Sequence, residues 1–181
     1  MTALLGGHFY YDVRMRIAFR KACQSDLAKL MQMFAYGQKR LAAIGVDQWE
    51  EGVYPNAQIV ADDIAASICY VAQTGGEVVA TMSIDPKPDP SFARADLAWR
   101  YPPEQAVVLH RLAVCESAQG RGVARGFLRF ASALAGRKHL RVDTSPQNLP
   151  MVNLLLSEGY ERVGTLVYED YGNIRCDCFE K

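Results

Sequence analysis

The stretch that decides the fold is residues 107–137, VVLHRLAVCESAQGRGVARGFLRFASALAGR. Its first eight residues are β-branched or aliphatic apart from His110 and Arg111, which predicts a buried central strand. A glycine-containing elbow over 119–124 comes next, and Gly136 before two basic residues predicts the end of a helix. The apolar residues that recur between those points at helical spacing are Val123, Phe127, Phe130 and Leu134. The stretch therefore predicts a strand, an elbow and an amphipathic helix.

The elbow has the chemistry of an anion site. The first amides of a helix lack partners inside the helix, and the helix dipole places partial positive charge there. Gly120 and Gly122 remove side chains that would keep an anion from these amides, and Arg121 and Arg125 add positive charge beside them. A diphosphate is the ligand that fits this arrangement best.

Two other interpretations of the elbow stay open from the residues alone. A glycine turn between a strand and a helix is commonly a plain connection. The glycines at 120, 122 and 126, with Asp143 beyond them, also approach the pattern of a dinucleotide-binding fold. That fold needs several further strand–helix units, and too little chain follows Gly126 to build them.

The elbow and the segments after it resemble a known family. Gln119-x-x-Gly122-x-Ala124 after a strand resembles the acyl-CoA pyrophosphate loop of the GNAT acetyltransferase superfamily, and Asn148 before a short helix that ends at Gly159-Tyr160 resembles the family's second motif. The resemblance covers about residues 15–180 and is strongest over 106–163. It implies a single-domain α/β (mixed α+β) fold, with a twisted mixed sheet of about six or seven strands that is flanked by helices and splayed at its two middle strands.

Composition is typical of one soluble globular domain of 181 residues. Twenty basic and twenty acidic residues balance, so charge makes no case for nucleic acid or a membrane surface as partner. The first residues lack the order of a secretory signal, and a cytoplasmic protein is expected. Five cysteines without a Cys-x-x-Cys pair, and three histidines without zinc-like spacing, predict reduced thiols and no metal.

The remaining pattern predicts an N-terminal extension over 1–14 and a single acyl-CoA-binding domain over 15–181. Within the domain we expect a strand from Met15, a helix from Leu27 that ends at Gly45 and is broken at Gly37, and a short helix over 58–66. A hairpin over 68–84, a proline-rich surface insertion over 85–104, a strand over 140–144 and a closing hairpin over 162–180 complete it. No repeat or linker interrupts this order.

The family resemblance implies acetyl-CoA as co-substrate, bound without a metal. The pyrophosphate would lie on the elbow, and the pantetheine arm would add to the open edge of the strand that ends at Val114, where a backbone N–H would polarise the thioester. Asn148 would reach the arm, or would instead cap its helix. The expected cofactor-binding residues are Leu112, Ala113, Val114, Gln119, Gly120, Arg121, Gly122, Val123, Ala124, Arg125 and Asn148.

The general base stays open among three residues. His110 can accept a proton near neutral pH, and some members of the superfamily place Glu or His at this strand position. Asp143 at the end of its strand, or Glu104 one loop away, could serve instead. Many members carry a Tyr seven residues after the Asn as acid for the leaving thiolate, and this chain has Leu155 there.

The resulting hypothesis is an N-acetyltransferase in which a primary amine attacks acetyl-CoA directly in a ternary complex. The alternative is a catalytically weak acyl-CoA-binding or regulatory module, which Leu155 makes credible. Aromatic faces suit an apolar or cationic amine, whether a small molecule or a peptide. Exposed edge strands make a homodimer plausible. The residues expected around the acceptor are Trp49, Tyr54, Trp99 and Tyr101.

Overall fold

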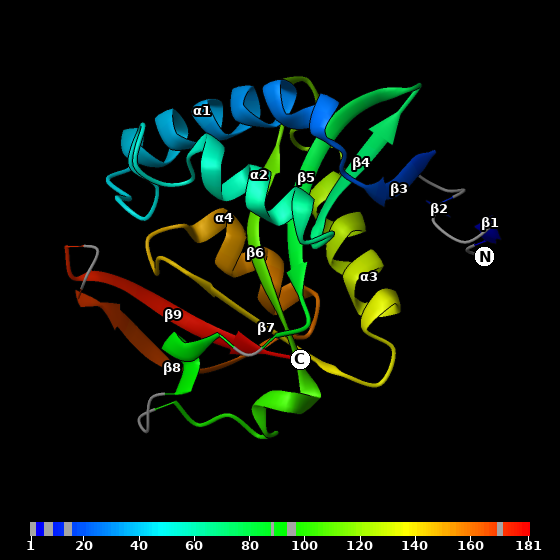
Figure 1. The fold of residues 1–181 in the computed structure, drawn as a ribbon. Coiled ribbons are helices and arrows are strands. Elements are labelled where there is room, and N and C mark those ends of the chain that lie inside the picture. The colour runs from blue at the N-terminus through cyan, green and yellow to red at the C-terminus, as the bar shows by residue number, and fades with distance from the viewer. Residues whose placement is uncertain (1–2, 6–8, 13–15, 88, 94–96, 170–171) are drawn as a thin grey trace.

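The computed structural model describes residues 3–5, 9–12, 16–87, 89–93, 97–169 and 172–181. In these residues nine strands form one mixed sheet in the order β1-β2-β3-β4-β5-β6-β7-β9-β8 (Figure 1). All neighbours are antiparallel except β6 and β7, which are parallel. The strands are β1 (Ala3–Leu5), β2 (Phe9–Asp12), β3 (Ile17–Lys21), β4 (Cys69–Thr74), β5 (Glu77–Asp85), β6 (Ala106–Val114), β7 (His139–Thr144), β8 (Glu161–Tyr168) and β9 (Ile174–Glu180).

Helices cover both faces of the sheet, and each face has its own core. On one face α1 (Leu27–Ala43) and α2 (Ala57–Ala65) pack on β4 and β6, and on the other α3 (Val123–Ala135) and α4 (Leu149–Ser157) pack on β3, β5, β6 and β7 (Figure 1). A stacked pair of rings, Phe19 on β3 and Phe130 on α3, lies 4.7 Å apart between centroids in the second core. The mixed α/β sheet flanked by helices confirms the predicted fold class, and it has nine strands instead of the expected six or seven because β1 and β2 of the expected extension join it.

The two middle strands separate, as expected. The parallel ladder between β6 and β7 runs from Ala106↔His139 to Leu109↔Val142 and ends there. Strand β6 continues to Val114 with only β5 beside it, and β7 continues to Thr144 with only β9 beside it. The last five residues of β6 therefore keep one open edge in the middle of the sheet, at the carboxyl ends of the two parallel strands.

We call the point where β6 and β7 separate, after Leu109 and Val142, the fork. A β-bulge in β6 lies beside it. Arg111 has a left-handed backbone (φ +56°), and the pairing of β6 with β5 shifts register between Thr81 and Ser83. A bulge re-aims the side chains of its strand. Here it places two consecutive side chains on the α1/α2 face, where His110 lies near Asp89 and Arg111 binds an α2 carboxylate.

Helix α1 differs from expectation at Gly37. The helix runs unbroken from Leu27 to Ala43, and Gly37 lies inside it. A Cβ at this position would stand 2.9 Å from the Trp49 ring, which also packs edge-on against Phe34 at 5.6 Å. The glycine therefore admits a ring against the helix and does not break it.

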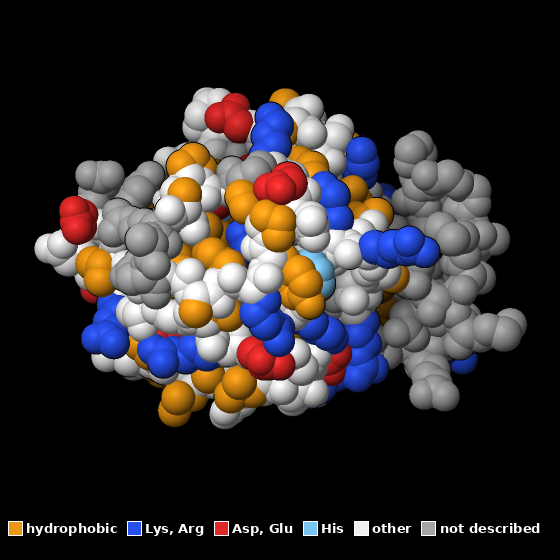
Figure 2. Space-filling model, turned by 90° about the horizontal axis from the view of Figure 1, so that it is seen from below, with side chains coloured by type: hydrophobic (Ala, Val, Ile, Leu, Met, Phe, Trp, Pro, Cys, Tyr) orange, Lys and Arg blue, Asp and Glu red, His pale blue; other side chains and the backbone are white. Residues whose placement is uncertain are grey.

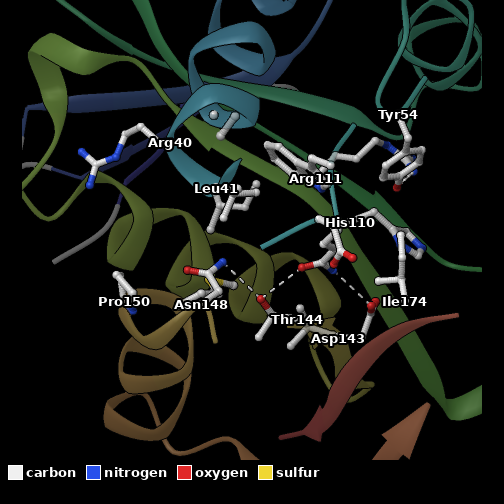
Figure 3. A pocket seen from close by; sticks show the side chains of 18 of the residues that line it. Arg40, Leu41, Tyr54, His110, Arg111, Asp143, Thr144, Asn148, Pro150 and Ile174 are labelled. Carbon is white, nitrogen blue, oxygen red and sulfur yellow. Dashed lines mark hydrogen bonds between the residues drawn. The ribbon is translucent and has the colours of Figure 1, made fainter. Parts of the chain in front are cut away.

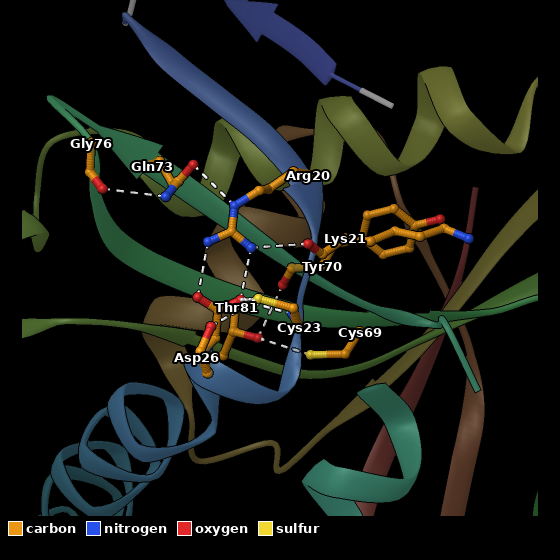
Figure 4. Close-up of polar contacts among 10 residues, drawn as sticks. Arg20, Lys21, Cys23, Asp26, Cys69, Tyr70, Gln73, Gly76 and Thr81 are labelled. Atoms are coloured by element: carbon orange, nitrogen blue, oxygen red, sulfur yellow. Dashed lines mark hydrogen bonds and ion pairs between the residues drawn. The ribbon is translucent and has the colours of Figure 1, made fainter. Parts of the chain in front are cut away.

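The start of α1 is fixed by an ion pair (Figure 4). Arg20 on β3 donates to both carboxylate oxygens of Asp26 at 2.7 and 2.9 Å, and the N–H of Cys23 donates to the same carboxylate at 2.8 Å. The Arg20 hydrogen bond, first among these contacts, lowers the pKa of Asp26 to about 2. Asp26 thus ties the helix to the sheet.

Strands β1 and β2 belong to the predicted N-terminal extension and continue the sheet beyond β3. Residues 1–2, 6–8 and 13–15 of that extension lie outside the described part. The division into an extension and a domain from residue 15 stays a prediction. On the face seen in Figure 2, basic and acidic side chains are interspersed, in line with their equal numbers in the sequence.

Candidate active site

A long groove follows the fork in the sheet. Its larger part has a volume of about 1070 Å³ and lies between α1, the 46–56 loop, the open end of β6 and the start of α4. Its smaller part, about 530 Å³, lies against the amino end of α3. The two parts share Val114, Gln119 and Pro150 as lining residues. The open strand edge and the amino end of α3 therefore belong to one continuous groove.

The elbow lies immediately before α3, and its two glycines have unusual backbones. Gly120 and Gly122 both have left-handed backbones (φ +71° and +77°), which glycine adopts without strain. The first bond inside α3 runs from the N–H of Gly126 to the carbonyl of Gly122 at 2.9 Å. The amides of Val123 and Ala124 precede that bond and line the smaller part of the groove. This end of the helix suits an anion.

Arg121 in the elbow and Arg125 in the first turn of α3 have different surroundings. Arg125 lines the groove, and its guanidinium pairs with Glu158 at the end of α4. Arg129, one turn along α3, binds the other Glu158 oxygen at 2.9 Å. Hydrogen bonds from Arg129 and then Arg125 hold the pKa of Glu158 below its usual range. Arg121 is exposed on the elbow, outside the lining of either part.

The open edge and Asn148 face each other across the groove. Leu112, Ala113 and Val114 line it from β6, and the Gln119 side chain donates to the carbonyl of Val114 at 2.9 Å. Asn148 makes no side-chain cap to α4, and instead its Nδ2 donates to Thr144 Oγ1 at 3.2 Å (Figure 3). The capping alternative is thus not realised, and the amide is left at the groove wall.

His110 and Asp143 are the first residues of their strands beyond the last ladder pair, one on each arm of the fork. Burial, with the positive charge of Arg111 second, lowers the pKa of His110 to about 4. Burial also raises the pKa of Asp143 to about 6, and the nearby negative charge of Asp89 acts in the same direction. At neutral pH His110 is a neutral, weakly basic ring and Asp143 is a carboxylate of increased basicity.

Sequence reasoning missed Gln48, which joins the 46–56 loop to the end of β7 at Asp143 and Thr144, both labelled in Figure 3. Its Nε2 donates to Asp143 Oδ2 at 3.4 Å, and its Oε1 accepts from the N–H of Ser145 at 3.0 Å. These contacts join residues 95 to 97 positions apart in the chain. No local pattern marks such a residue, because a glutamine in a polar loop is ordinary.

A second missed group lies on the α1/α2 side of the fork. Arg111 binds Asp63 on α2 through Nη2 at 2.6 Å and Nε at 2.8 Å, and its Nη1 donates to the Tyr54 hydroxyl at 3.0 Å. Ser83 donates to the same Asp63 oxygen at 2.5 Å. This group, the Arg111 cluster (Asp63, Ser83, Arg111 and Tyr54), ties the 46–56 loop to β6.

The structure brings some of the expected acceptor residues to the groove and not others. Trp49 and Tyr54 line it. Trp99 donates from Nε1 to the Phe92 carbonyl at 2.8 Å, with the Arg141 guanidinium 4.2 Å from its ring, and Tyr101 stacks on His139 at the opposite end of β7. Glu104 is exposed in a short turn before β6 begins. These three residues lie away from the fork, because the connection from β5 to β6 runs back to the amino ends of the parallel strands.

Comparison with known proteins identifies the architecture. The family model described as the acetyltransferase (GNAT) family matches residues 38–160, about two thirds of the chain. The chain belongs to the GNAT acetyltransferase family. This confirms the expected superfamily, whose members are acyltransferases, and the matched residues contain the fork, the elbow and Asn148. No curated protein matches the sequence.

Solved structures of GNAT proteins share the fold. A GNAT-family acetyltransferase from Streptococcus agalactiae is 23% identical, with a TM-score of 0.82 over 92% of this chain and 95% of that one. One from Listeria monocytogenes is 18% identical, with a TM-score of 0.69 over 100% and 99%. A putative acetyltransferase from Salmonella typhimurium, solved with acetyl-CoA, is 16% identical, with a TM-score of 0.62 over 91% and 92%.

Three further observations concern the described residues only. No helix among them has the length and apolarity needed to cross a membrane. They contain no group of three or more His, Cys, Asp or Glu side chains placed to hold a metal ion. All five cysteines are free thiols, of which Cys23 is exposed.

Proposed function

We propose that this GNAT protein transfers the acetyl group of acetyl-CoA to a primary amine by direct attack in a ternary complex. The observation that carries the proposal is the end of the β6–β7 ladder at Leu109↔Val142. It leaves an open strand edge that leads, through one continuous groove, to the uncapped amino end of α3. The related fold solved with acetyl-CoA adds support.

The residues along the groove fit the parts of acetyl-CoA. The pyrophosphate would accept hydrogen bonds from the amides that begin α3, with Arg125 beside them. The pantetheine arm would pair with the open edge of β6 near Leu112 and Val114, as an added strand does. Asn148 would hydrogen-bond the arm from the opposite wall. The thioester would then lie at the fork, near His110 and Asp143.

Asp143 is the residue that we assign as general base. The amine must lose a proton so that its lone pair can form the N–C bond while the C–S bond breaks and the thiolate leaves. A carboxylate with a pKa raised to about 6 accepts that proton better than an imidazole with a pKa lowered to about 4. Glu104 lies too far from the fork for this role.

A direct test follows loss of thioester absorbance when purified protein, acetyl-CoA and a panel of primary amines are mixed. Absorbance is preferable to a thiol-reactive dye because Cys23 is a free, exposed thiol. We expect turnover with at least one amine and initial-rate lines that intersect when both substrates are varied. Parallel lines would indicate an acetylated protein intermediate and would contradict direct attack.

A catalytically weak acyl-CoA-binding module is the second candidate. The observation that favours it is Leu155, a hydrocarbon side chain without a proton to give to a leaving thiolate, which is fully buried in the core between α4 and the sheet. A thiolate is a tolerable leaving group even without an acid. Tight binding of acetyl-CoA by calorimetry, with no turnover of any amine, would establish the module and exclude the enzyme.

A further inference from the structure

The acceptor half of the groove is formed by three segments that meet beyond the fork. The 46–56 loop contributes Val53 and Tyr54, the connection after β5 contributes Asp89, and the β8–β9 hairpin contributes Tyr168. In Figure 3 Tyr54 and His110 lie on this side, and Arg40, Asn148 and Pro150 lie on the other. The second side continues to the amino end of α3, because Pro150 lines both parts of the groove.

Two carboxylates in this half, those of Asp89 and Asp143, face the fork. Asp89 Oδ2 lies 3.9 Å from His110 Nε2, and Asp89 and Asp143 line the same part of the groove. Burial raises the pKa of Asp143, and the Asp89 charge acts in the same direction. Among the described residues no lysine or arginine forms an ion pair with either carboxylate. With His110 neutral, a positively charged ligand is what would relieve their mutual repulsion.

Arg111 lines the acceptor half, but its guanidinium already forms an ion pair with Asp63. Asp63 binds it at 2.6 and 2.8 Å, Tyr54 occupies a third N–H, and its side chain is 11% exposed. Withdrawal of the guanidinium to bind a substrate carboxylate would leave Asp63 buried without its partner, which is strongly unfavourable. The acceptor half therefore attracts cations and offers no site for an anion among its described residues.

The walls of this half are apolar and aromatic. Val53 is half exposed, and Tyr54, Tyr168 and Ile174 line the groove around the carboxylates. Such walls cover a hydrocarbon or ring and leave the charged end of a ligand to Asp89 and Asp143.

From this arrangement, and resting on the proposed function, we infer that the acceptor is a positively charged primary amine on an apolar or aromatic body, without a carboxylate beside the amine. The ammonium enters between Asp89 and Asp143 and gives one proton to Asp143. The nitrogen lone pair then forms the bond to the acetyl carbon, the C–S bond breaks, and the second proton of the nitrogen passes to the departing coenzyme A thiolate. An amino acid is disfavoured because its carboxylate would face Asp89 and Asp143.

The test uses pairs of amines that differ by one carboxylate. Tyramine is compared with tyrosine, and 1,5-diaminopentane with lysine, by kcat/KM at saturating acetyl-CoA. We expect each decarboxylated amine to be better by at least about 10-fold, as repulsion between like charges in a partly buried site requires. Tyrosine methyl ester, which keeps the shape of tyrosine and removes its negative charge, should recover most of the loss. Equal kcat/KM for tyramine and tyrosine, or no recovery with the ester, would overturn the inference.

Variants locate the discrimination in the groove. Asp89→Asn should reduce the tyramine-to-tyrosine ratio several-fold, whereas Asp62→Asn, on the exposed side of α2, should leave it unchanged. An unchanged ratio in Asp89→Asn would contradict the assignment of Asp89. Calorimetry of the same amines with protein saturated with coenzyme A gives the ranking independently of catalysis. Absence of turnover together with the expected binding order would therefore count against the proposed enzyme alone, and equal binding would count against this inference.

Discussion

Burial shifts the pKa values of two neighbouring side chains at the fork in opposite directions. Burial disfavours the charged form of each, so it lowers the pKa of His110 to about 4 and raises that of Asp143 to about 6. Arg111 adds to the first shift and Asp89 to the second. The residue with the more familiar catalytic chemistry is therefore the weaker base here, and the carboxylate is the stronger one.

This difference makes a pH prediction. Because a base must be unprotonated, kcat/KM should rise with pH through about 6 in the native protein. Asp143→Asn should remove that limb and lower kcat/KM by about 10²–10⁴-fold, the usual contribution of a general base. His110→Gln is the matched comparison and should keep the limb. Loss of the limb in His110→Gln, with its retention in Asp143→Asn, would move the base to the imidazole.

Among the elements, the amino end of α3 is the one that the proposed donor site needs most. Gly122 has φ +77° immediately before the helix and lines the smaller part of the groove. A side chain there meets two penalties, a strained backbone and a Cβ beside the path of the anion. The two can be separated, because other glycines share the backbone strain without lining the groove.

We predict that Gly122→Leu raises the Kd of coenzyme A by roughly 100-fold, or about 2.7 kcal/mol, in calorimetry. Gly75→Leu, in the β4–β5 turn at φ +57° and with open space around it, should show the strain alone. It should lower the free energy of unfolding by about 1–2 kcal/mol and leave the Kd unchanged. Equal Kd values for the two variants would remove the elbow from the donor site.

The anchor of α1 makes a stability prediction. The pKa of Asp26 is about 2 in the folded protein against an ordinary value of 3.8, so its charged form stabilises the fold at any pH above about 4. That contribution is lost as pH falls through about 2. Asp26→Asn should therefore lower the free energy of unfolding by about 1–2 kcal/mol at pH 7, a value reduced by solvent near the pair. Denaturant titrations should show the gap closing between pH 4 and 2; a constant gap would contradict the ion-pair origin.

The sequence predicts helices, strands and turns correctly where the spacing of apolar residues and the position of a glycine indicate the same element boundary. The strand, elbow and helix over 107–137 and both hairpins are present because each depends on local pattern. Gly37 is a position where local pattern fails. A glycine in the middle of a helical pattern predicts a break, but here the ring of Trp49, which is distant in sequence, occupies the space that a Cβ would fill. The bulge at Arg111 is invisible for the same reason, since partners from α2 and the 46–56 loop hold it.

Across the whole molecule, a buried ion pair joins β7 to the last strand, and the same two residues also bind the β5–β6 connection. Glu180 on β9 is fully buried and binds Arg141 on β7 at 3.1 Å, and it also accepts from the N–H of Arg100 at 2.9 Å. Arg141 in turn donates to the Tyr101 carbonyl and lies over Trp99. The aromatic pair that the sequence assigned to the acceptor thus serves the fold at the other end of the sheet.

We predict that Glu180→Gln lowers the free energy of unfolding by about 3–5 kcal/mol, because it leaves Arg141 buried without its counter-charge. Glu161→Gln offers a control on the adjacent strand, since Glu161 also pairs with Arg100 but is 69% exposed. Its effect should stay within about 0.5 kcal/mol. Thermal and urea unfolding measure both. Similar small losses for the two variants would show that the buried pair is not essential.

The lining of the groove was more predictable from the sequence on the side of the elbow than on the acceptor side. On the elbow side, residues 112–125 belong to one strand–elbow–helix unit and come together by local folding, and only the opposite wall, with Asn148, comes from another element. The acceptor side is built by segments that are distant in the sequence, and its key contacts, Gln48 with Asp143 and Arg111 with Asp63, join residues 95 and 48 positions apart. Trp49 and Trp99 are both aromatic residues in loops, and the sequence does not show that Trp49 lines the groove whereas Trp99 packs at the other end of the sheet.

The open stretch of β6 has a consequence for the behaviour of the protein in crowded solution. A sheet's unsatisfied edge normally lies at its border, where another chain can add to it and start aggregation. Here one such edge lies in the interior, walled by α1 on one side and α4 on the other. We expect these walls to admit a single extended chain and to hinder the approach of a second folded sheet. The helices that form the groove should therefore also protect the open edge of β6 from aggregation with another sheet.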